Sequence, residues 1–168
     1  RQFYYRGFRC FPELSGYLRV HNRDLPLDAR TFLFAESVRA LMPRGERYLR
    51  LFGSVSAGGH IVGLSFADGA DSADENALFC DGVLCPLGRV YVKRSASDPL
   101  RPWYISDGGR RLHLEMKVGR EYRIRRRALL AVSDLRQYFG TLSGTVELPD
   151  GEIVPIENMH ISCEEKLR

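Results

Sequence analysis

The sequence predicts an all-β, antiparallel fold, either a barrel or a strongly curved sandwich of about ten strands. Apolar and polar residues alternate with a period of two over several long runs, as they do in half-buried strands. Turn residues recur every ~8–12 positions, a spacing typical of barrels and sandwiches. Two glycines, Gly140 and Gly144, fall on the apolar face of the clearest run, where glycine marks a bend or a close approach. We therefore expect a strongly curved sheet.

The length of the chain bounds its organisation. A sequence of 168 residues fits one domain over residues 1–168, large enough to bury a core without a disulfide or a metal. With 44% apolar and 27% charged residues the composition is that of a globular protein. No apolar run reaches the ~20 residues of a membrane-spanning helix. Because Arg1 opens the sequence, we expect a processed product or a fragment that has lost any targeting peptide.

Charge and cysteine usage indicate a class of partner and a compartment. The chain has 25 Lys+Arg against 21 Asp+Glu, a net charge of +4, and most of the basic residues are arginines. The planar fork of arginine suits phosphate and carboxylate, which favours an anionic partner such as RNA, a membrane surface or an acidic protein; a GC-rich genome explains the bias equally well. Four cysteines without two close pairs predict reduced thiols and an intracellular compartment, cytoplasmic or organellar, although a Cys80–Cys85 bridge is sterically open.

The first half of the chain divides into short strands separated by glycine, asparagine and aspartate. The expected strands are residues 3–9, Ser15–Val20, Asp24–Leu27, Thr31–Ala35, Arg47–Ala57, His60–Phe66, Asn76–Cys80, Val83–Leu87 and Arg89–Lys93. Glu36–Ala40 has the length of a single helical turn. The acidic loop with Asp68, Asp71 and Asp74 lacks the spacing of a calcium loop, so we expect it to face solvent.

The second half contains the longest predicted strands. They are Arg101–Ser106, Arg110–Lys117, residues 119–132, Gln137–Leu148, Glu152–Ile156 and Ile161–Leu167. In residues 119–132 the alternation predicts a half-buried face with Tyr122 and Ile124, and an outer face with Arg123, Arg125 and Arg127. Arg126 interrupts this alternation and predicts a bulge, and Pro155 predicts an edge strand.

Three blocks of sequence carry a resemblance to a known family. They are Gly59–Leu64 with Glu75–Phe79 and Asp81-Gly82; Arg101-Pro102-Trp103; and Gln137–Gly144 with Asp150-Gly151 and Cys163-Glu164-Glu165. In this order, from about residue 14 to its end, the chain resembles the C-terminal half of the domain-of-unknown-function family 2804. The resemblance implies kinship with double barrels of the hydroxyneurosporene hydratase type. It therefore implies a lipocalin-like (calycin-type) barrel with an apolar cavity, and a second barrel half that this chain does not contain.

The sequence departs from the family pattern at expected cavity positions. Arg47-Tyr48-Leu49-Arg50 stands where the resemblance leads us to expect Arg-Trp-x-Trp, and Glu36-Ser37 stands where we expect Asp-Trp. Arg136 stands where we expect a histidine before the Gln-x-Phe-Gly motif. These changes remove aromatic or titratable groups and keep the glycines. They are typical of a barrel that is kept for its shape after its chemistry is lost.

Two sets of residues are candidate sites. The ligand-cavity set, whose alternative role is to fill the core, is Tyr48, Phe52, Glu75, Trp103, Tyr138, Gly140 and Gly144. Glu75 is either a general acid or base or a carboxylate that binds the loop backbone. Arg123, Arg125 and Arg127 repeat at about 6.5–7 Å along a strand, which suits successive phosphates, with a solvated face as the alternative. We predict no metal and no cofactor, because the spaced motifs such chemistry needs are missing.

Three functions follow from these sites. The leading prediction is a non-catalytic β module that is a structural or partner-binding subunit of a larger assembly, RNA-containing assemblies included. The second is a protein that binds a lipid or another apolar small molecule. The third, implied by the family kinship, is a cofactor-free hydratase or isomerase acting on a hydrophobic substrate, with Glu75 or Glu36 as its acid.

Overall fold

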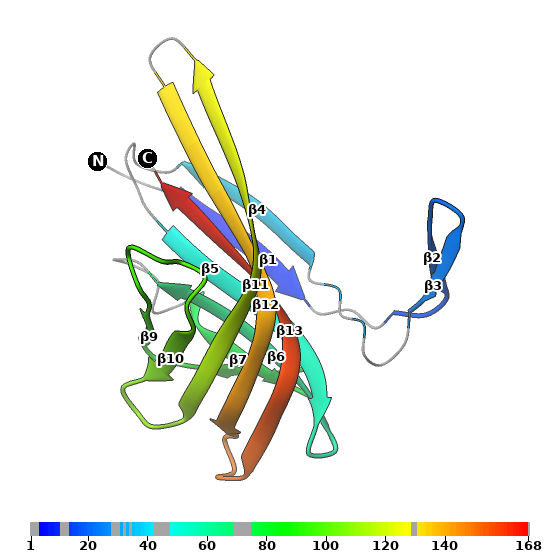
Figure 1. Cartoon of the computed structure of the whole chain (residues 1–168). Helices are drawn as coiled ribbons and strands as arrows, with labels where there is room; N and C mark the ends of the chain where they lie inside the picture. Colours follow the sequence, from blue (N-terminus) through cyan, green and yellow to red (C-terminus); the bar gives the residue numbers. More distant parts are fainter. Residues whose placement is uncertain are drawn as a thin grey trace.

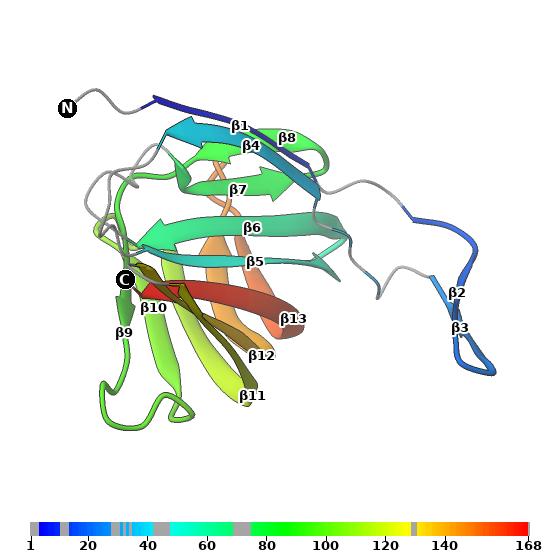
Figure 2. The same cartoon turned by 90° about the horizontal axis from the view of Figure 1, so that it is seen from above.

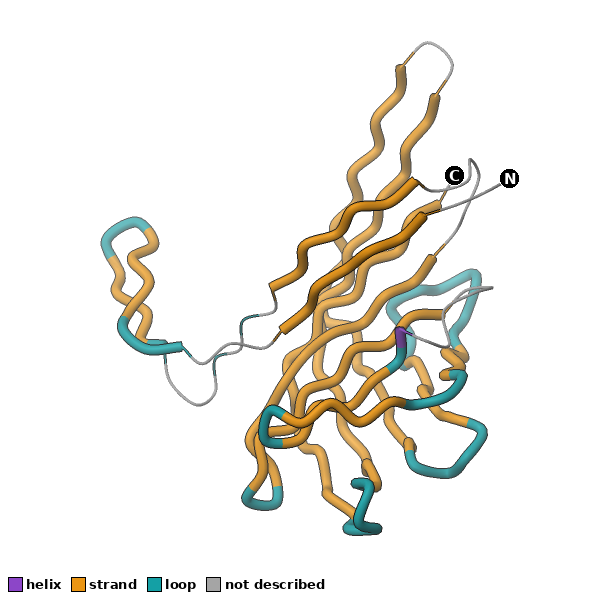
Figure 3. Tube along the Cα trace, turned by 180° about the vertical axis from the view of Figure 1, so that it is seen from behind, coloured by secondary structure: helices purple, strands orange, loops and turns teal. Residues whose placement is uncertain are grey.

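A computed structural model describes residues 4–10, 14–27, 31, 33, 35–41, 48–68, 75–128 and 131–167. These residues contain thirteen strands, so the all-β prediction is confirmed. Strands make up most of the described chain (Figure 3). The prediction of a solvated loop at Asp71 and Asp74 lies outside the described residues.

The strands form three antiparallel sheets. Their bounds are β1 Tyr4–Cys10, β2 Tyr17–Val20, β3 Arg23–Pro26, β4 Ala35–Leu41, β5 Tyr48–Ala57, β6 His60–Asp68, β7 Ala77–Cys80, β8 Val83–Pro86, β9 Val90–Lys93, β10 Trp103–Asp107, β11 Leu112–Ala128, β12 Ala131–Glu147 and β13 Ile153–Leu167. The main sheet has nine strands in the order β8-β7-β6-β5-β13-β12-β11-β10-β9. The pairs β1–β4 and β2–β3 form the two small sheets.

The main sheet is strongly curled, like half of a barrel (Figures 1 and 2). Seen from above, it turns from β8 through β5 and β12, and its other edge strand, β9, comes back close to β6. The expected curvature is therefore present. At the upper end in Figure 1, β11 and β12 extend past the rest of the sheet as a two-stranded ribbon.

Two pairs of predicted strands are each one continuous strand. Arg110–Lys117 and residues 119–132 were predicted separately, but β11 runs through both with a bulge between Val118 and Arg120. The predicted bulge at Arg126 is wrong, because Arg126 pairs in register with Ser133. The bulge lies instead at Gly119, which adds one residue to the strand without ending the pairing.

The last strand was also predicted in two pieces, Glu152–Ile156 and Ile161–Leu167, which β13 joins. Pro155 was expected at an edge, whereas β13 lies in the middle of the sheet. The prediction holds locally, because Pro155 pairs with Thr145 of β12 and the pairing with β5 begins only at Ile161.

The helical turn predicted for Glu36–Ala40 is wrong: these residues belong to β4 and pair with β1. An isolated helical turn forms one hydrogen bond but must fix several backbone dihedrals, which costs conformational entropy. Strand pairing instead forms backbone hydrogen bonds at every second residue. The β1–β4 ribbon lies across the outer face of the main sheet (Figure 2), and Glu36 reaches Arg50 of β5 at 3.2 Å.

The core fills the concave face of the curled sheet. Its inward side chains come from all nine strands of the main sheet, and the largest that are fully buried include Trp103, Tyr138, Phe66 and Met159. The expected close approach at the two glycines is confirmed. A Cβ on Gly140 would lie 2.2 Å from the Lys117 carbonyl oxygen, and a Cβ on Gly144 would lie 2.0 Å from that of His113.

Candidate functional site

The inner face of the sheet changes character at the Gly119 bulge. Before it, Met116 pairs with Leu142 and both are fully buried. After it, the inward positions shift from even to odd residues, because the extra residue reverses the alternation. Glu121 then pairs with Tyr138, and Arg123 pairs with Arg136. The arginines were predicted on the outer face, and this prediction is wrong for Arg123 and Arg125, because the bulge places both on the side of the buried Tyr138. Tyr122 was predicted on the half-buried face and is instead 53% exposed.

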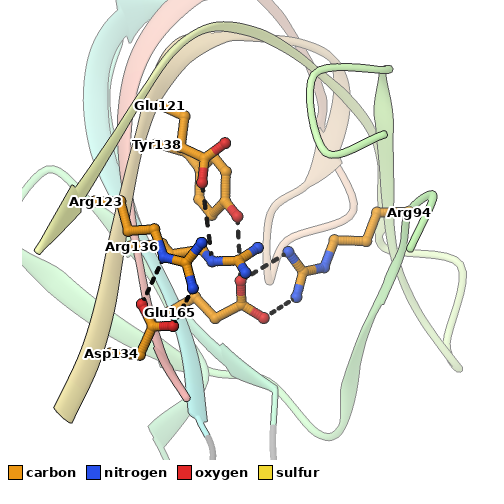
Figure 4. A network of polar contacts seen from close by, with 7 residues as sticks. All are labelled: Arg94, Glu121, Arg123, Asp134, Arg136, Tyr138 and Glu165. Atoms are coloured by element: carbon orange, nitrogen blue, oxygen red, sulfur yellow. Dashed lines mark hydrogen bonds and ion pairs between the residues drawn. The ribbon is translucent and has the colours of Figure 1, made fainter. Parts of the chain in front are cut away.

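Seven residues form an inner polar network at this end of the sheet (Figure 4); they are Arg94, Glu121, Arg123, Asp134, Arg136, Tyr138 and Glu165. Their carboxylates and guanidiniums come from β11, β12, β13 and the segment after β9. The network thus joins an edge of the sheet to its middle.

Glu165 is the centre of the network. Its side chain is only 9% exposed and receives two hydrogen bonds from Arg94, one of them at 3.2 Å, and one from the Tyr138 hydroxyl at 3.2 Å. Burial raises the pKa of the Tyr138 phenol above its ordinary value. Arg94 also lies 4.8 Å from the centre of the Trp103 ring, a cation–π distance. Both Glu165 oxygens therefore have donors within the protein.

The three arginines of the predicted anionic-partner surface are not equivalent. Arg123 donates two hydrogen bonds to Asp134, one of them at 2.8 Å, and these hold the pKa of Asp134 below its ordinary value. Arg125 is exposed and pairs in the backbone register with Asp134. The side chain of Arg127 lies outside the described part of the structure. A surface contact at this ribbon therefore depends first on Arg125.

The structure divides the predicted cavity residues between the two faces of the sheet. Trp103 and Tyr138 are both fully buried and meet edge to face with ring centres 4.8 Å apart, so they fill the core. Tyr48 and Phe52 alternate with the buried Leu51 of β5 and therefore lie on the outer face of the sheet.

The two carboxylates predicted as acids share one cation on that outer face. Glu36 lies 3.2 Å and Glu75 lies 3.4 Å from nitrogens of Arg50. The Arg50 guanidinium also lies 5.0 Å from the centre of the Tyr48 ring. These residues connect the β1–β4 ribbon and the start of β7 to β5, so both acids have a structural contact.

A hollow of about 360 Å³ opens on the outer face; its lining is Gly119, Arg120, Phe139, Gly140, Thr141, His160, Ile161 and Ser162. It lies where the bulge at Gly119 interrupts the pairing of β11 with β12. Of the predicted cavity residues, Gly140 lines it, and its lining contains no carboxylate.

Sequence reasoning missed Arg94, Asp134 and Glu165. Glu165 belongs to the Cys163-Glu164-Glu165 block that carries part of the family resemblance, and its burial follows from the register with Arg136 and Leu49. A useful signal was present: Glu165 follows the inward positions Ile161 and Cys163 at a spacing of two.

These observations define a class of protein: an antiparallel half-barrel with a filled concave face and internally paired charges. The chain belongs to the family described as Domain of unknown function (DUF2804), whose model matches residues 1–168. The comparison with curated proteins and the comparison with solved structures find no match. Within the described residues, none of the helical structure is long and apolar enough to cross a membrane.

Proposed function

We propose that this chain is a non-catalytic, partner-binding β module of a larger assembly. The observation that carries the proposal is the β2–β3 hairpin, which stands away from the main sheet (Figures 1 and 3). Its apolar side chains Tyr17, Leu18, Val20 and Leu25 are 42–63% exposed. We call this hairpin the β2–β3 arm.

The β2–β3 arm has the properties of a contact element. A two-stranded hairpin alone is marginally stable in water, and clustered apolar side chains mark surfaces that bind other molecules. Leu18 pairs across the arm with Leu25, and Arg19 holds Asp24 through two hydrogen bonds at 2.6 and 2.9 Å. Docking on a protein partner would bury the apolar pair and order the arm further.

The state of the acidic groups supports a role without catalysis. A general acid or base needs a free route to a substrate proton. Glu165 instead binds Arg94 and Tyr138, and Glu36 and Glu75 both bind Arg50. The filled concave face likewise favours a scaffold over the lipid-binding and hydratase alternatives.

The arm proposal is tested in the full chain by site-specific photo-crosslinking in the native source. A photoreactive residue at Leu18 should crosslink one defined protein partner, and one at the exposed Ile153 of the main sheet should not. The variant Leu18→Asp/Leu25→Asp should lose the complex on size-exclusion chromatography and keep the β circular-dichroism spectrum. A complex of unchanged size with this variant would overturn the proposal.

A contact with RNA is a second candidate, favoured by the exposed Arg125 on the projecting β11–β12 ribbon. If Arg123, Arg125 and Arg127 each neutralise one phosphate, log K for a single-stranded oligonucleotide should fall with log salt at a slope of about −2. Their replacement by glutamine should abolish this binding in fluorescence anisotropy. Asp134→Asn releases Arg123 and should strengthen it. Equal binding by all three proteins would exclude the ribbon as an RNA contact.

A further inference from the structure

Neighbouring turns at one end of the main sheet bring together three side chains with metal-binding atoms. His60 ends the β5–β6 turn, and Cys80 and Asp81 begin the β7–β8 turn. One ligand atom from each residue lies within 4.8 Å of the other two. The turns are joined by two backbone contacts: the Asp81 N–H donates to the Ile61 carbonyl at 3.0 Å, and the Ile61 N–H donates to Asp81 Oδ1 at 2.8 Å.

The Asp81 carboxylate has a defined orientation. Because Oδ1 accepts from the Ile61 backbone, Oδ2 is the oxygen that faces His60 Nδ1 at 2.7 Å and Cys80 Sγ at 3.8 Å. Asp81 and Gly82 have φ values of 49° and 82°, the left-handed pair that Asp-Gly provides in tight hairpins. The turn itself therefore holds the carboxylate beside the other two groups.

The other nitrogen of the imidazole also has a partner. His60 Nε2 lies 3.4 Å from Glu152 Oε2, on the turn between β12 and β13. Histidines that bind metals generally present their second ring nitrogen to a carboxylate, a carbonyl or water, which fixes the tautomer and the ring orientation. An ion pair that only holds the two hairpins together would need His60 and Asp81 alone. A metal centre would also use Cys80 as a ligand and Glu152 as the partner of the second imidazole nitrogen.

We propose that His60 Nδ1, Cys80 Sγ and Asp81 Oδ2 bind a divalent transition-metal ion of the zinc type, with Glu152 orienting the imidazole. Nitrogen, thiolate and carboxylate are all zinc ligands, and bonds of ~2.0–2.3 Å in a tetrahedron separate the ligand atoms by roughly 3.3–3.8 Å. The spacing within 4.8 Å needs only small side-chain rotations to reach this geometry. On binding, the thiol proton and the proton between Nδ1 and Asp81 pass to solvent.

The site is accessible and incomplete by one ligand. The His60 and Asp81 side chains are 29% and 52% exposed, so an ion can enter from solvent. Three protein ligands leave the fourth position to water or to a donor from another molecule. The cluster was missed in the sequence because His60 and Cys80 are twenty positions apart, and only the sheet places their turns side by side. This inference is independent of the partner-binding function.

Cobalt(II) is the probe for this site, with the full chain purified under reducing, metal-free conditions. One equivalent should produce a sulfur-to-cobalt charge-transfer band and the intense visible bands of tetrahedral Co²⁺, and Zn²⁺ should displace both. Cys80→Ser should abolish the charge-transfer band, and His60→Gln should weaken binding at least ~10-fold. Glu152→Gln should weaken it by about 10–100-fold, the usual effect of losing such a supporting contact.

Two matched variants control for other cysteines and histidines. Cys85→Ala lies in the same hairpin and His160→Gln lies on the outer face, and both should leave the cobalt titration unchanged. Circular dichroism shows whether each variant is folded. Because His60→Gln and Cys80→Ser remove different ligands, each tests the metal site even if the other variant fails to fold. The proposal is overturned if the reduced wild-type chain gives no cobalt spectrum at one equivalent. It is also overturned if the charge-transfer band survives in folded Cys80→Ser.

Discussion

The two halves of the long β11–β12 pair share one inner face and are stabilised in opposite ways. Below the Gly119 bulge, pairs such as Met116–Leu142 are buried, apolar and tightly packed. Above it, the facing positions are charged, as in the Arg123–Arg136 pair, and belong to the inner polar network (Figure 4). We call these the packed half and the polar half.

This difference shows what each half tolerates. The packed half derives its stability from apolar burial, worth about 25 cal/mol per Å², and is sensitive to any added or removed atom. The polar half depends on the balance of its charges, because a buried charge without its partner is strongly unfavourable. Substitutions that add volume and substitutions that remove charge should therefore have their large effects in different halves.

The largest effect is expected in the packed half, from Gly144→Ala. The new Cβ would lie 2.0 Å from the His113 carbonyl oxygen, and the φ of Gly144 is +141°. Overpacking costs ~1–3 kcal/mol and the strained backbone ~1–3 kcal/mol, so the free energy of unfolding should fall by about 2–6 kcal/mol in urea denaturation. Gly151→Ala separates the two causes, because its φ is +89° with no atom within 4 Å of the new Cβ. Equal losses for both variants would rule out the steric clash.

A somewhat smaller effect is expected in the polar half, from Arg94→Met. This change leaves the buried Glu165 without its cation. A fully buried pair would lose about 3–5 kcal/mol, and because the Arg94 side chain is 24% exposed, the free energy of unfolding should fall by less than that. The double variant Arg94→Met/Glu165→Met removes both charges and should regain most of that loss. If the double variant lost as much free energy of unfolding as the two single variants added together, Arg94 and Glu165 would not be energetically coupled.

The smallest effect is expected at the exposed end of the polar half, where Arg123 binds Asp134. The hydrogen bonds from Arg123 lower the pKa of Asp134 from its ordinary 3.8. Since the folded pKa lies below the unfolded one, this pair stabilises the fold above about pH 3.8, and the contribution disappears as the pH falls through the folded pKa. Carboxyl NMR should show Asp134 titrating below 3.8 and returning toward it in Arg123→Gln. An unchanged Asp134 titration in that variant would contradict the pairing.

The thiols give a further contrast between exposed and buried sites. Within the part of the chain that the structure describes, Cys80, Cys85 and Cys163 are free. Cys163 is fully buried, and burial raises the pKa of its thiol. Of these three described cysteines, Cys80 is the partly exposed one beside Asp81, so its thiol is accessible to a metal ion.

Local patterns predicted the strands and several turns well. The Gly58-Gly59 and Asp81-Gly82 turns and the strand ends beside them agree with the structure, because positive φ values at these positions are a property of the residues themselves. The candidate sites were predicted less well. Tyr48 and Trp103 have similar chemistry, and the strand pattern did not show that they lie on opposite faces of a curled sheet.

The amino-acid sequence by itself determined the β class, the period of each strand and the glycines at the close approaches, because these depend on residues next to one another. The tertiary structure decided which side of each strand faces inward and which distant groups meet. One extra residue at Gly119 reverses the inward face of β11, a change that alternation alone does not reveal. The pairing of Arg94 with Glu165 and the meeting of His60 with Cys80 likewise arise from sheet order and curl. Sheet order is set by the burial of the whole core, which is a property of all strands together.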